Sequence, residues 1–399
     1  MNFMDLDEKA INLHKKNKGK IEIRSKVPLE SVDDLSLAYT PGVAAVSREI
    51  SKNKELVYDL TSKGNMVAVV TDGSAVLGLG NIGPEAALPV MEGKAILFKE
   101  LADINAFPIV LKTQDVEEII RTVRNIAPGF GAINFEDISA PRCFEIEERL
   151  QDLGIPVFHD DQHGTAIVLL AALINASKVA GKNFEDLKVV ISGAGAAGTA
   201  ITKILQCSGM EKNVCIPVRD IIVCDSKGII YKDRPGLGKV KENLAAVTNR
   251  NQMKGTLKEA MVGADVFIGV SSGGLVTKEM ISSMNEKSIV FAMANPTPEI
   301  MPDVAKAGGA FIIATGRSDF PNQVNNVLAF PGVFKGALEA RARQITSQMK
   351  IAAVRALSEM VQNPKPDNIL PKPLDKKATE AVAEAVRIAA SNGSFRDQS

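Results

Sequence analysis

The stretch LKVVISGAGAAGTAITKILQ (187–206) determines the fold class. It begins with an apolar run typical of a buried strand, continues with a glycine-rich turn and ends in a segment with helical periodicity. The turn has the spacing G-x-G-x-x-G and consists of Gly193, Ala194, Gly195, Ala196, Ala197 and Gly198. A strand, this turn and a helix, in that order, are typical of a doubly wound α/β domain.

The chemistry of the turn favours a dinucleotide. Its glycines let the backbone approach a pyrophosphate at the start of the helix, where unpaired N–H groups and the helix dipole attract an anion. The next apolar run ends in Asp225, which is placed to accept hydrogen bonds from ribose hydroxyls. The spacing is longer than usual, and GMEKNVCIPVR (209–219) accounts for the added residues. The alternative is a turn that only lets helix and strand pack closely; we predict a dinucleotide site.

Outward from this stretch, apolar runs alternate with helix-like segments along most of the chain after an irregular N-terminal arm. The predicted strands are VAVV (67–70), PIVL (108–111), AINF (132–135), PVFH (156–159), LKVVIS (187–192), DIIVCD (220–225), DVFIGV (265–270), SIVFAMA (288–294) and AFIIAT (310–315). This alternation implies right-handed crossovers and parallel sheets, so the fold class is α/β.

The same pattern suggests how the chain is divided. We expect a parallel-sheet substrate and metal domain over 1–161, a Rossmann-type dinucleotide-binding domain over 162–335, and a C-terminal helical segment over 336–399. A long helix-like stretch, TAIVLLAALINASKVAG (165–181), joins the two halves.

The composition excludes several classes of protein. The 399 residues carry 47 basic and 47 acidic side chains without a charge run, which argues against nucleic acid as a partner. Hydrophobic residues at 45% and charged residues at 24% are ordinary for a globular protein with a large core. No apolar stretch reaches the roughly 18 to 20 residues needed to span a bilayer, and the N-terminus has no apolar signal core, so we expect a cytoplasmic protein without a membrane partner.

The chain contains four cysteines, Cys143, Cys207, Cys215 and Cys224. None of them forms a C-x-x-C pair, so neither a zinc site nor a disulfide framework is indicated. We expect all four to be reduced structural thiols, as is usual in a reducing compartment.

Acidic residues follow three of the predicted strands in the first half: Asp72, Glu136, Asp137, Asp160 and Asp161. Carboxyl ends of parallel strands meet at one edge of the sheet, so these acids would converge there. Their mutual repulsion is tolerable only if a cation or a positive side chain lies there. Oxygen ligands without cysteine suit Mg²⁺ or Mn²⁺ better than zinc. For any single acid a turn or helix cap is the alternative, particularly for Asp160 and Asp161 before a helix.

The sequence resembles malic enzymes, specifically the short bacterial form. The matching segments are SLAYTPGVA (36–44), VTDGSAVLGLGNIGPEAALPVMEGKA (70–95), NFEDI (134–138), FHDDQHGTA (158–166), the glycine turn, MANPTPE (293–299) and SDFPNQVNNVLAFPGVF (318–334). The resemblance implies oxidative decarboxylation of L-malate to pyruvate and CO₂ with NAD or NADP and a divalent metal, Mg²⁺ or Mn²⁺. Asp225 favours NAD, because a carboxylate there repels the 2′-phosphate of NADP.

The resemblance also implies roles for individual residues. Lys94 matches the base that takes the malate hydroxyl proton, Tyr39 matches the acid that protonates enolpyruvate, and Asp160 matches a further acid that we group with them. The matched metal ligands are Glu136, Asp137 and Asp161. Asn295 and Asn326 match residues that hold the substrate, and Asn295 also borders the cofactor. We expect His159 and His163 to hydrogen-bond beside the metal ligands rather than bind the metal.

The chain departs from the long eukaryotic forms at one position of interest. Those forms carry an arginine for the substrate carboxylate where this chain reads Ser74-Ala75-Val76. The backbone of the turn Gly78 to Gly83 is a candidate substitute. Lys94 must also lose proton affinity to act as a base, and we expect partial burial and a nearby divalent cation to lower its pKa.

Two other functions remain open. A malolactic-type enzyme would retain NAD and release lactate, and a non-catalytic NAD-sensing protein would use only the nucleotide half. The N-terminal segment GKIEIRSKVPL (19–29) resembles an arm that packs on a partner subunit, so we expect a homodimer.

Overall fold

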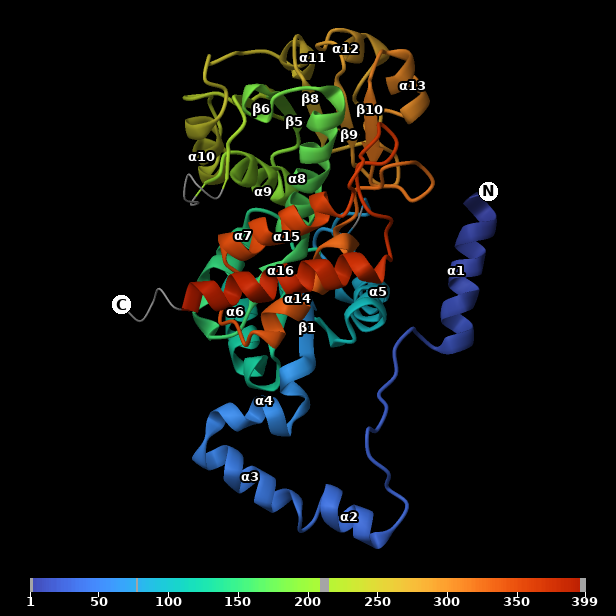
Figure 1. The fold of residues 1–399 in the computed structure, drawn as a ribbon, viewed down its shortest axis with the longest axis vertical. Coiled ribbons are helices and arrows are strands. Elements are labelled where there is room, and N and C mark those ends of the chain that lie inside the picture. The colour runs from blue at the N-terminus through green and yellow to red at the C-terminus, as the bar shows by residue number, and fades with distance from the viewer. Residues whose placement is uncertain (1–2, 77, 209–214, 395–399) are drawn as a thin grey trace.

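The computed structural model describes residues 3–76, 78–208 and 215–394 (Figure 1). The first half contains a four-stranded parallel sheet with the order β2-β1-β3-β4. Its strands are β1 (Met66–Thr71), β2 (Asn105–Val110), β3 (Ala132–Phe135) and β4 (Val157–His159). The strand β1 is central and almost fully buried, as its run of β-branched residues predicts.

The second half contains a six-stranded sheet with the order β10-β9-β8-β5-β6-β7. Its strands are β5 (Lys188–Ser192), β6 (Asp220–Asp225), β7 (Gly228–Ile229), β8 (Val266–Gly269), β9 (Ile289–Ala292) and β10 (Ile312–Thr315). All pairs are parallel except β6 with β7. The nine predicted strands are present, and the two-residue strand β7 is an addition that was too short to predict. The α/β class with a Rossmann-type sheet is confirmed.

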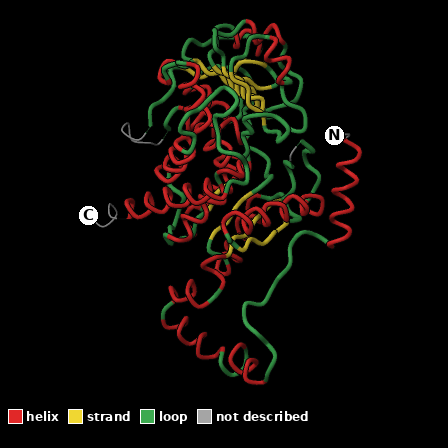
Figure 2. The backbone as a smooth tube through the Cα atoms, turned by 45° about the vertical axis from the view of Figure 1, so that its right-hand side comes forward, coloured by secondary structure: helices red, strands yellow, loops and turns green. Residues whose placement is uncertain are grey.

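Helices connect the strands of both sheets, as the predicted crossovers require (Figure 2). In the first half they are α5 (Pro84–Ala102), α6 (Val116–Ile126) and α7 (Arg142–Arg149). In the second half they are α9 (Ala196–Leu205), α10 (Lys239–Val247), α11 (Leu257–Met261), α12 (Lys278–Ser282) and α13 (Pro302–Ala307).

The helix α8 (Asp160–Ala180) joins the two sheets and begins earlier than predicted, directly at the paired aspartates. It also corrects the prediction about bilayer length. By length and a mean hydropathy of 1.4, α8 could cross a membrane. However, 72% of the apolar window is buried inside the molecule. Its apolar residues therefore serve the shared core, where α8 contacts α9, α15 and the strands β4 and β9.

Three C-terminal helices, α14 (Phe330–Glu339), α15 (Ser347–Glu359) and α16 (Lys376–Ser394), pack on one another. They also pack on α5 and α8, so the end of the chain returns to the first half (Figure 1). Phe98 of α5 contacts Phe330 and Phe334 edge to face at centroid distances of 4.8 and 5.2 Å. These aromatic contacts fix α14 beside α5.

The N-terminal arm is helical rather than irregular, which corrects the prediction. It contains α1 (Phe3–Asn17), α2 (Val32–Ala38), α3 (Val43–Lys52) and α4 (Val57–Leu60). The helices α2 and α3 stand away from the body of the molecule (Figure 1). None of the residues of α2 to α4 is buried. The apolar side chains of α2 to α4 do not pack into the core of this chain. The sequence therefore has no core-facing periodicity here from which these helices could be predicted.

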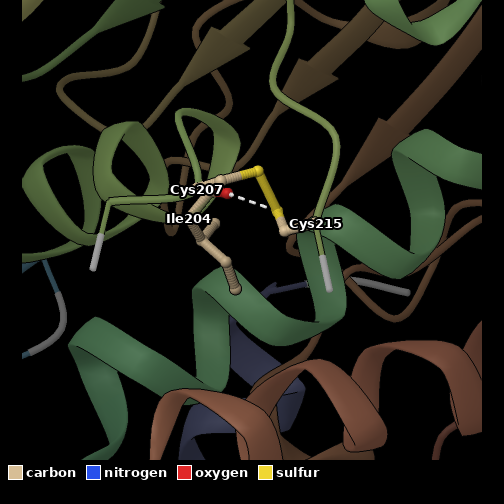
Figure 3. The surroundings of a disulfide bond; sticks show 3 residues. All are labelled: Ile204, Cys207 and Cys215. Carbon is tan, nitrogen blue, oxygen red and sulfur yellow. Dashed lines mark hydrogen bonds between the residues drawn. A yellow bond between two sulfur atoms is a disulfide. The ribbon is translucent and has the colours of Figure 1, made fainter. Parts of the chain in front are cut away.

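The prediction of four reduced cysteines is wrong for two of them. Cys207 and Cys215 form a disulfide, with their Cα atoms 5.6 Å apart (Figure 3). The two residues are eight positions apart, a separation that no C-x-x-C spacing marks. Of the insertion 209–219, residues 209–214 lie outside the described residues. Cys143 and Cys224 are free and buried, and burial raises the pKa of each thiol to about 12.

Candidate active site

Lys94 lies at the acidic edge that the sequence predicts. Its helix α5 packs on β1 and β2 and carries the side chain toward the ends of β3 and β4. Lys94 Nζ lies 3.0 Å from Glu136 Oε1 and donates a hydrogen bond to Asp160 Oδ2. The Lys94 side chain is 12% exposed and that of Asp160 is fully buried. The surface position that is common for lysine is therefore excluded, and the acids that contact Lys94 come from other elements.

Of the three predicted metal ligands, Glu136 forms an ion pair with this lysine and Asp161 interacts with it electrostatically. Glu136 follows β3, and its Oε1 accepts a hydrogen bond of 2.7 Å from Asn134 Nδ2. The backbone N–H of Asp137 donates to Asp161 Oδ2 at 2.8 Å. Asp137 has a φ of 54°, a left-handed conformation that Asp tolerates better than most residues. This turn of the chain places Asp137 beside the first turn of α8.

The charges at this edge fit a divalent cation. Within the described residues, no three acidic, histidine or cysteine side chains already form a metal cluster. One ammonium instead faces three carboxylates, those of Glu136, Asp160 and Asp161. Burial raises the pKa of Asp160 and Glu136, while Lys94 lowers both. Asp160 Oδ1 is buried without a hydrogen-bond partner among the described residues. Carboxylate oxygens in excess of nearby positive charge suit Mg²⁺ or Mn²⁺.

The pKa of Lys94 shifts against the expectation. Burial lowers it, but the carboxylates of Asp160, Glu136 and Asp161 together raise it above its ordinary value. The expected lowering included a divalent cation, whose charge opposes that of the carboxylates. Lys94 can therefore accept a proton near neutral pH only when other positive charge compensates these acids.

The two histidines of the motif differ in their contacts. His163 Nε2 lies 2.8 Å from Glu147 Oε1, a hydrogen bond to an acid that is not among the predicted ligands. His159 Nδ1 lies 3.8 Å from Oδ2 of the predicted ligand Asp161, and the ring nitrogens of His159 have no hydrogen-bond partner among the described residues.

Tyr39 is not brought to this site within the chain. It ends α2 on the N-terminal arm and is 66% exposed. The arm contacts α5 at one end, where Lys20 Nζ donates to the carbonyl of Pro89 at 2.7 Å. Beyond that contact it leads away from the body (Figure 1).

The two asparagines lie where the halves of the chain meet. A β-carbon at Gly164, in the first turn of α8, would be only 3.2 Å from Cβ of Asn326. A β-carbon at Gly78 would be 2.4 Å from the carbonyl oxygen of Asn295. Gly78 has a φ of 69°, so this close approach requires glycine. The turn proposed to hold the substrate carboxylate therefore touches the loop after β9.

An arginine that was not predicted as a site residue lies beside this turn. Arg142 Nη2 donates to Asp72 Oδ2 and to Ser74 Oγ, both at 2.9 Å. Asp72 is buried, and its ion pair with Arg142 holds the loop after β1 in place. Phe330 is a second missed residue, since Lys94 Nζ lies 4.4 Å from its ring centroid. Phe330 lies within the segment 318–334 and Arg142 lies four residues after the segment 134–138, but only the folded structure reveals their contacts.

The glycine turn has the geometry that close packing and ligand approach both need. A β-carbon at Gly198 would be 1.9 Å from the carbonyl oxygen of Gly193, so helix and strand pack tightly there. A β-carbon at Gly195 would meet nothing within 4 Å. Gly195 precedes Ala196 and Ala197 in the first turn of α9 and has no side chain to cap it. The N–H groups of that turn are therefore open to an anion.

Asp225 stands at the end of β6 as predicted, but it is already paired. Its carboxylate accepts hydrogen bonds from Arg234, at 3.0 Å for Nη1, and from Lys241 at 2.6 Å. The backbone N–H of Lys227 donates to it at 2.9 Å. Burial raises the pKa of Asp225, but the bonds from Arg234 and Lys241 hold it well below its usual range.

Carboxylates around a buried lysine, next to a dinucleotide-binding sheet, define a two-domain α/β dehydrogenase. Comparison with known families assigns this class more closely. Residues 18–151 match the malic enzyme N-terminal domain, and residues 162–391 match the malic enzyme NAD-binding domain. The chain belongs to the malic enzyme family, whose members couple malate decarboxylation to NAD(P).

Individual relatives agree with this assignment. The chain is 58% identical to the bifunctional malic/malolactic enzyme of Bacillus subtilis, over 97% of this chain and 93% of that protein. It is 54% identical to the NAD-dependent malic enzyme of Geobacillus stearothermophilus, over 92% and 76%. The crystal structure of the NAD-dependent malic enzyme of Thermotoga maritima is similar with a TM-score of 0.90 and 49% identity, covering 95% of this chain and 98% of that one.

Proposed function

We propose that the protein oxidatively decarboxylates L-malate to pyruvate and CO₂ at a site centred on Lys94. NAD is reduced in this reaction and released as NADH. The observation that supports this proposal is the position of Lys94 between Glu136 and Asp160, beside the meeting point of the two halves. The test is an absorbance assay at 340 nm with L-malate, Mn²⁺ and NAD, combined with analysis of the product. Accumulation of NADH with pyruvate is the expected result.

In this proposal each group has a defined task. Glu136, Asp137 and Asp161 would hold Mg²⁺ or Mn²⁺, which supplies a Lewis acid for the oxygen at the reacting carbon. Lys94 accepts the hydroxyl proton of malate, and Asp160 keeps the ammonium of Lys94 oriented. Asn295 and Asn326 hold the substrate at the meeting point of the halves.

We propose Tyr39 as the acid that protonates C3 of enolpyruvate, and its exposed position on the arm supports a role in the site of a second copy of the chain. The arm that carries it exposes large apolar residues that water would otherwise solvate, including Leu29, Val32 and Leu37. We therefore propose a homodimer in which the arm of one subunit packs on the other and delivers Tyr39 to the partner's Lys94 site. We also propose a cytoplasmic location and the domain division at residues 161 and 335.

For the cofactor we propose NAD over NADP, bound at the turn Gly193 to Gly198 with Asp225 at its ribose. The paired carboxylate of Asp225 accepts hydrogen bonds from free hydroxyls, whereas a 2′-phosphate would bring like charge.

The malolactic reaction is the second candidate, because the Bacillus subtilis relative is named for both activities. A malolactic enzyme would keep its NAD and release lactate. The assay above separates the two functions, because lactate without net NADH would identify the malolactic outcome and pyruvate with NADH the malic one.

A further inference from the structure

A chain of three polar side chains lies beneath the first turn of α8, and the proposed reaction does not use it. Glu147 comes from α7, His163 from α8 and Lys350 from α15. His163 Nε2 lies 2.8 Å from Glu147 Oε1, and Lys350 Nζ lies 3.1 Å from His163 Nδ1. These three side chains therefore link the C-terminal helix α15 to the first turn of α8, which carries Asp160 and Asp161.

The chemistry of the three groups fixes the direction of these hydrogen bonds. An ammonium can only donate, so Nδ1 of His163 accepts from Lys350. The Nε2–H of His163 then donates to Glu147. Glu147 is well suited to accept, since burial raises its pKa but His163 and Lys350 lower it to about 2. The result is a neutral imidazole of one tautomer between a cation and an anion.

Glu147 also holds the turn through two further contacts. Its Oε1 accepts from the backbone N–H of His159 at 3.2 Å, and its Oε2 accepts from Gln162 Nε2 at 3.1 Å. One carboxylate therefore binds residues before and after Asp160 and Asp161. These contacts lie on both sides of Asp160 and Asp161. A rotation of the first turn of α8 about the helix axis would therefore break them.

We propose that Glu147, His163 and Lys350 are positioning residues that hold Asp160 and Asp161 in the orientation needed for divalent-cation binding. This inference rests on the proposed metal site. None of the three would touch the cation; they act through the turn. Loss of a group that orients metal ligands commonly weakens metal affinity by about 10- to 100-fold. We expect Lys350→Met to have an effect in this range, because it removes the donor that orients His163.

The experiment measures Mn²⁺ binding to the whole protein without substrate or turnover. Free Mn²⁺ is followed by electron paramagnetic resonance during titration of the wild type, Lys350→Met, Lys350→Arg and a control. The control is Lys182→Met, which breaks the 2.7 Å ion pair of Lys182 with Asp265 in the nucleotide half. All four are titrated well below their Tm values. NAD affinity is measured in parallel, and should not change in either Lys350 variant.

The expected result is at least about tenfold weaker Mn²⁺ binding in Lys350→Met, recovery to within about threefold in Lys350→Arg, and no change in the control. Unchanged Mn²⁺ affinity in Lys350→Met would overturn the inference. If Lys350→Met does not fold, Glu147→Gln decides instead, with the same expectation and the same overturning result. Absence of Mn²⁺ binding in the wild type would contradict the proposed metal site itself, which is a distinguishable outcome.

Discussion

Lys94 Nζ lies 3.0 Å from Glu136 Oε1, so the proposed base and a proposed metal ligand form one ion pair. The same ammonium is hydrogen-bonded to Asp160. Protonation of Lys94 and cation binding by the carboxylates are therefore coupled, because positive charge added at the acids favours proton loss from the lysine. This coupling makes the base and the metal ligands testable together.

Lys94→Ala should abolish malate oxidation and also change stability. Loss of a general base costs about 10²- to 10⁴-fold in rate. With EDTA present, removal of the buried ammonium leaves the acids uncompensated, a change typically worth about 3–5 kcal/mol. Thermal unfolding should show a lower Tm that Mn²⁺ raises again without restoring turnover. Lys99→Ala, at an exposed position of the same helix, is the control. Near-normal malate turnover in Lys94→Ala would return this lysine to a structural role.

Chelation should stop turnover, and Mn²⁺ or Mg²⁺ should restore it. Asp161→Ala should weaken Mn²⁺ affinity by at least about tenfold, since it removes a proposed oxygen ligand. Equilibrium titration of Mn²⁺ measures this directly. Asp152→Ala removes an exposed carboxylate and should leave the affinity unchanged. Full activity in metal-free protein would rule out the metal assignment.

Delivery of Tyr39 between subunits predicts complementation. Tyr39→Phe and Lys94→Ala should each be nearly inactive alone. After mixing under conditions that exchange subunits, mixed dimers contain one site with both residues intact. Random exchange should restore about a quarter of wild-type activity, because half the dimers are mixed and each has one working site. No recovery despite demonstrated exchange would show that Tyr39 acts within its own chain or not at all.

The sheet strands could be predicted because their signal is local. Runs such as VAVV and IIVCD combine β-branched residues with turn residues at their ends, and each became a strand. The acidic edge could also be predicted, since parallel strands bring their carboxyl ends together. In contrast, the contacts of Lys94 depend on the packing of α5 on β1 and β2, which brings its side chain to acids that follow β3 and β4. Its sequence neighbours gave no indication of Glu136 or Asp160.

The N-terminal arm and the disulfide could not be predicted for related reasons. The helices of the arm bury nothing within this chain, so they carry no core-facing pattern. Cys207 and Cys215 are eight residues apart and form a disulfide that spacing alone does not reveal. Arg142 was not predicted because it begins α7, whereas its partner Asp72 follows β1, far away in the sequence.

The disulfide makes a prediction about stability. Cys207→Ser should lower the Tm, and dithiothreitol should lower the wild-type Tm to a similar value while leaving that of the variant unchanged. A cross-link that closes a loop this short contributes about 2–3 kcal/mol by restricting the unfolded chain. Thiol titration of the unreduced, unfolded wild type should find only Cys143 and Cys224. Four reactive thiols would contradict the cross-link.

The last prediction concerns cofactor choice and rests on Asp225. The wild type should show a higher kcat/KM for NAD than for NADP, because the buried carboxylate repels a 2′-phosphate.

Asp225→Ser should reverse the preference. Arg234 and Lys241 now pair with Asp225, and without it both cations are available for the phosphate. We expect the kcat/KM ratio of NADP to NAD to rise by more than about tenfold, equivalent to about 1.4 kcal/mol in transition-state binding. Asp303→Ser, an exposed change in the same half, is the control for a general effect of lost charge. A wild-type enzyme that prefers NADP tenfold would mean that Arg234 and Lys241 already outweigh Asp225.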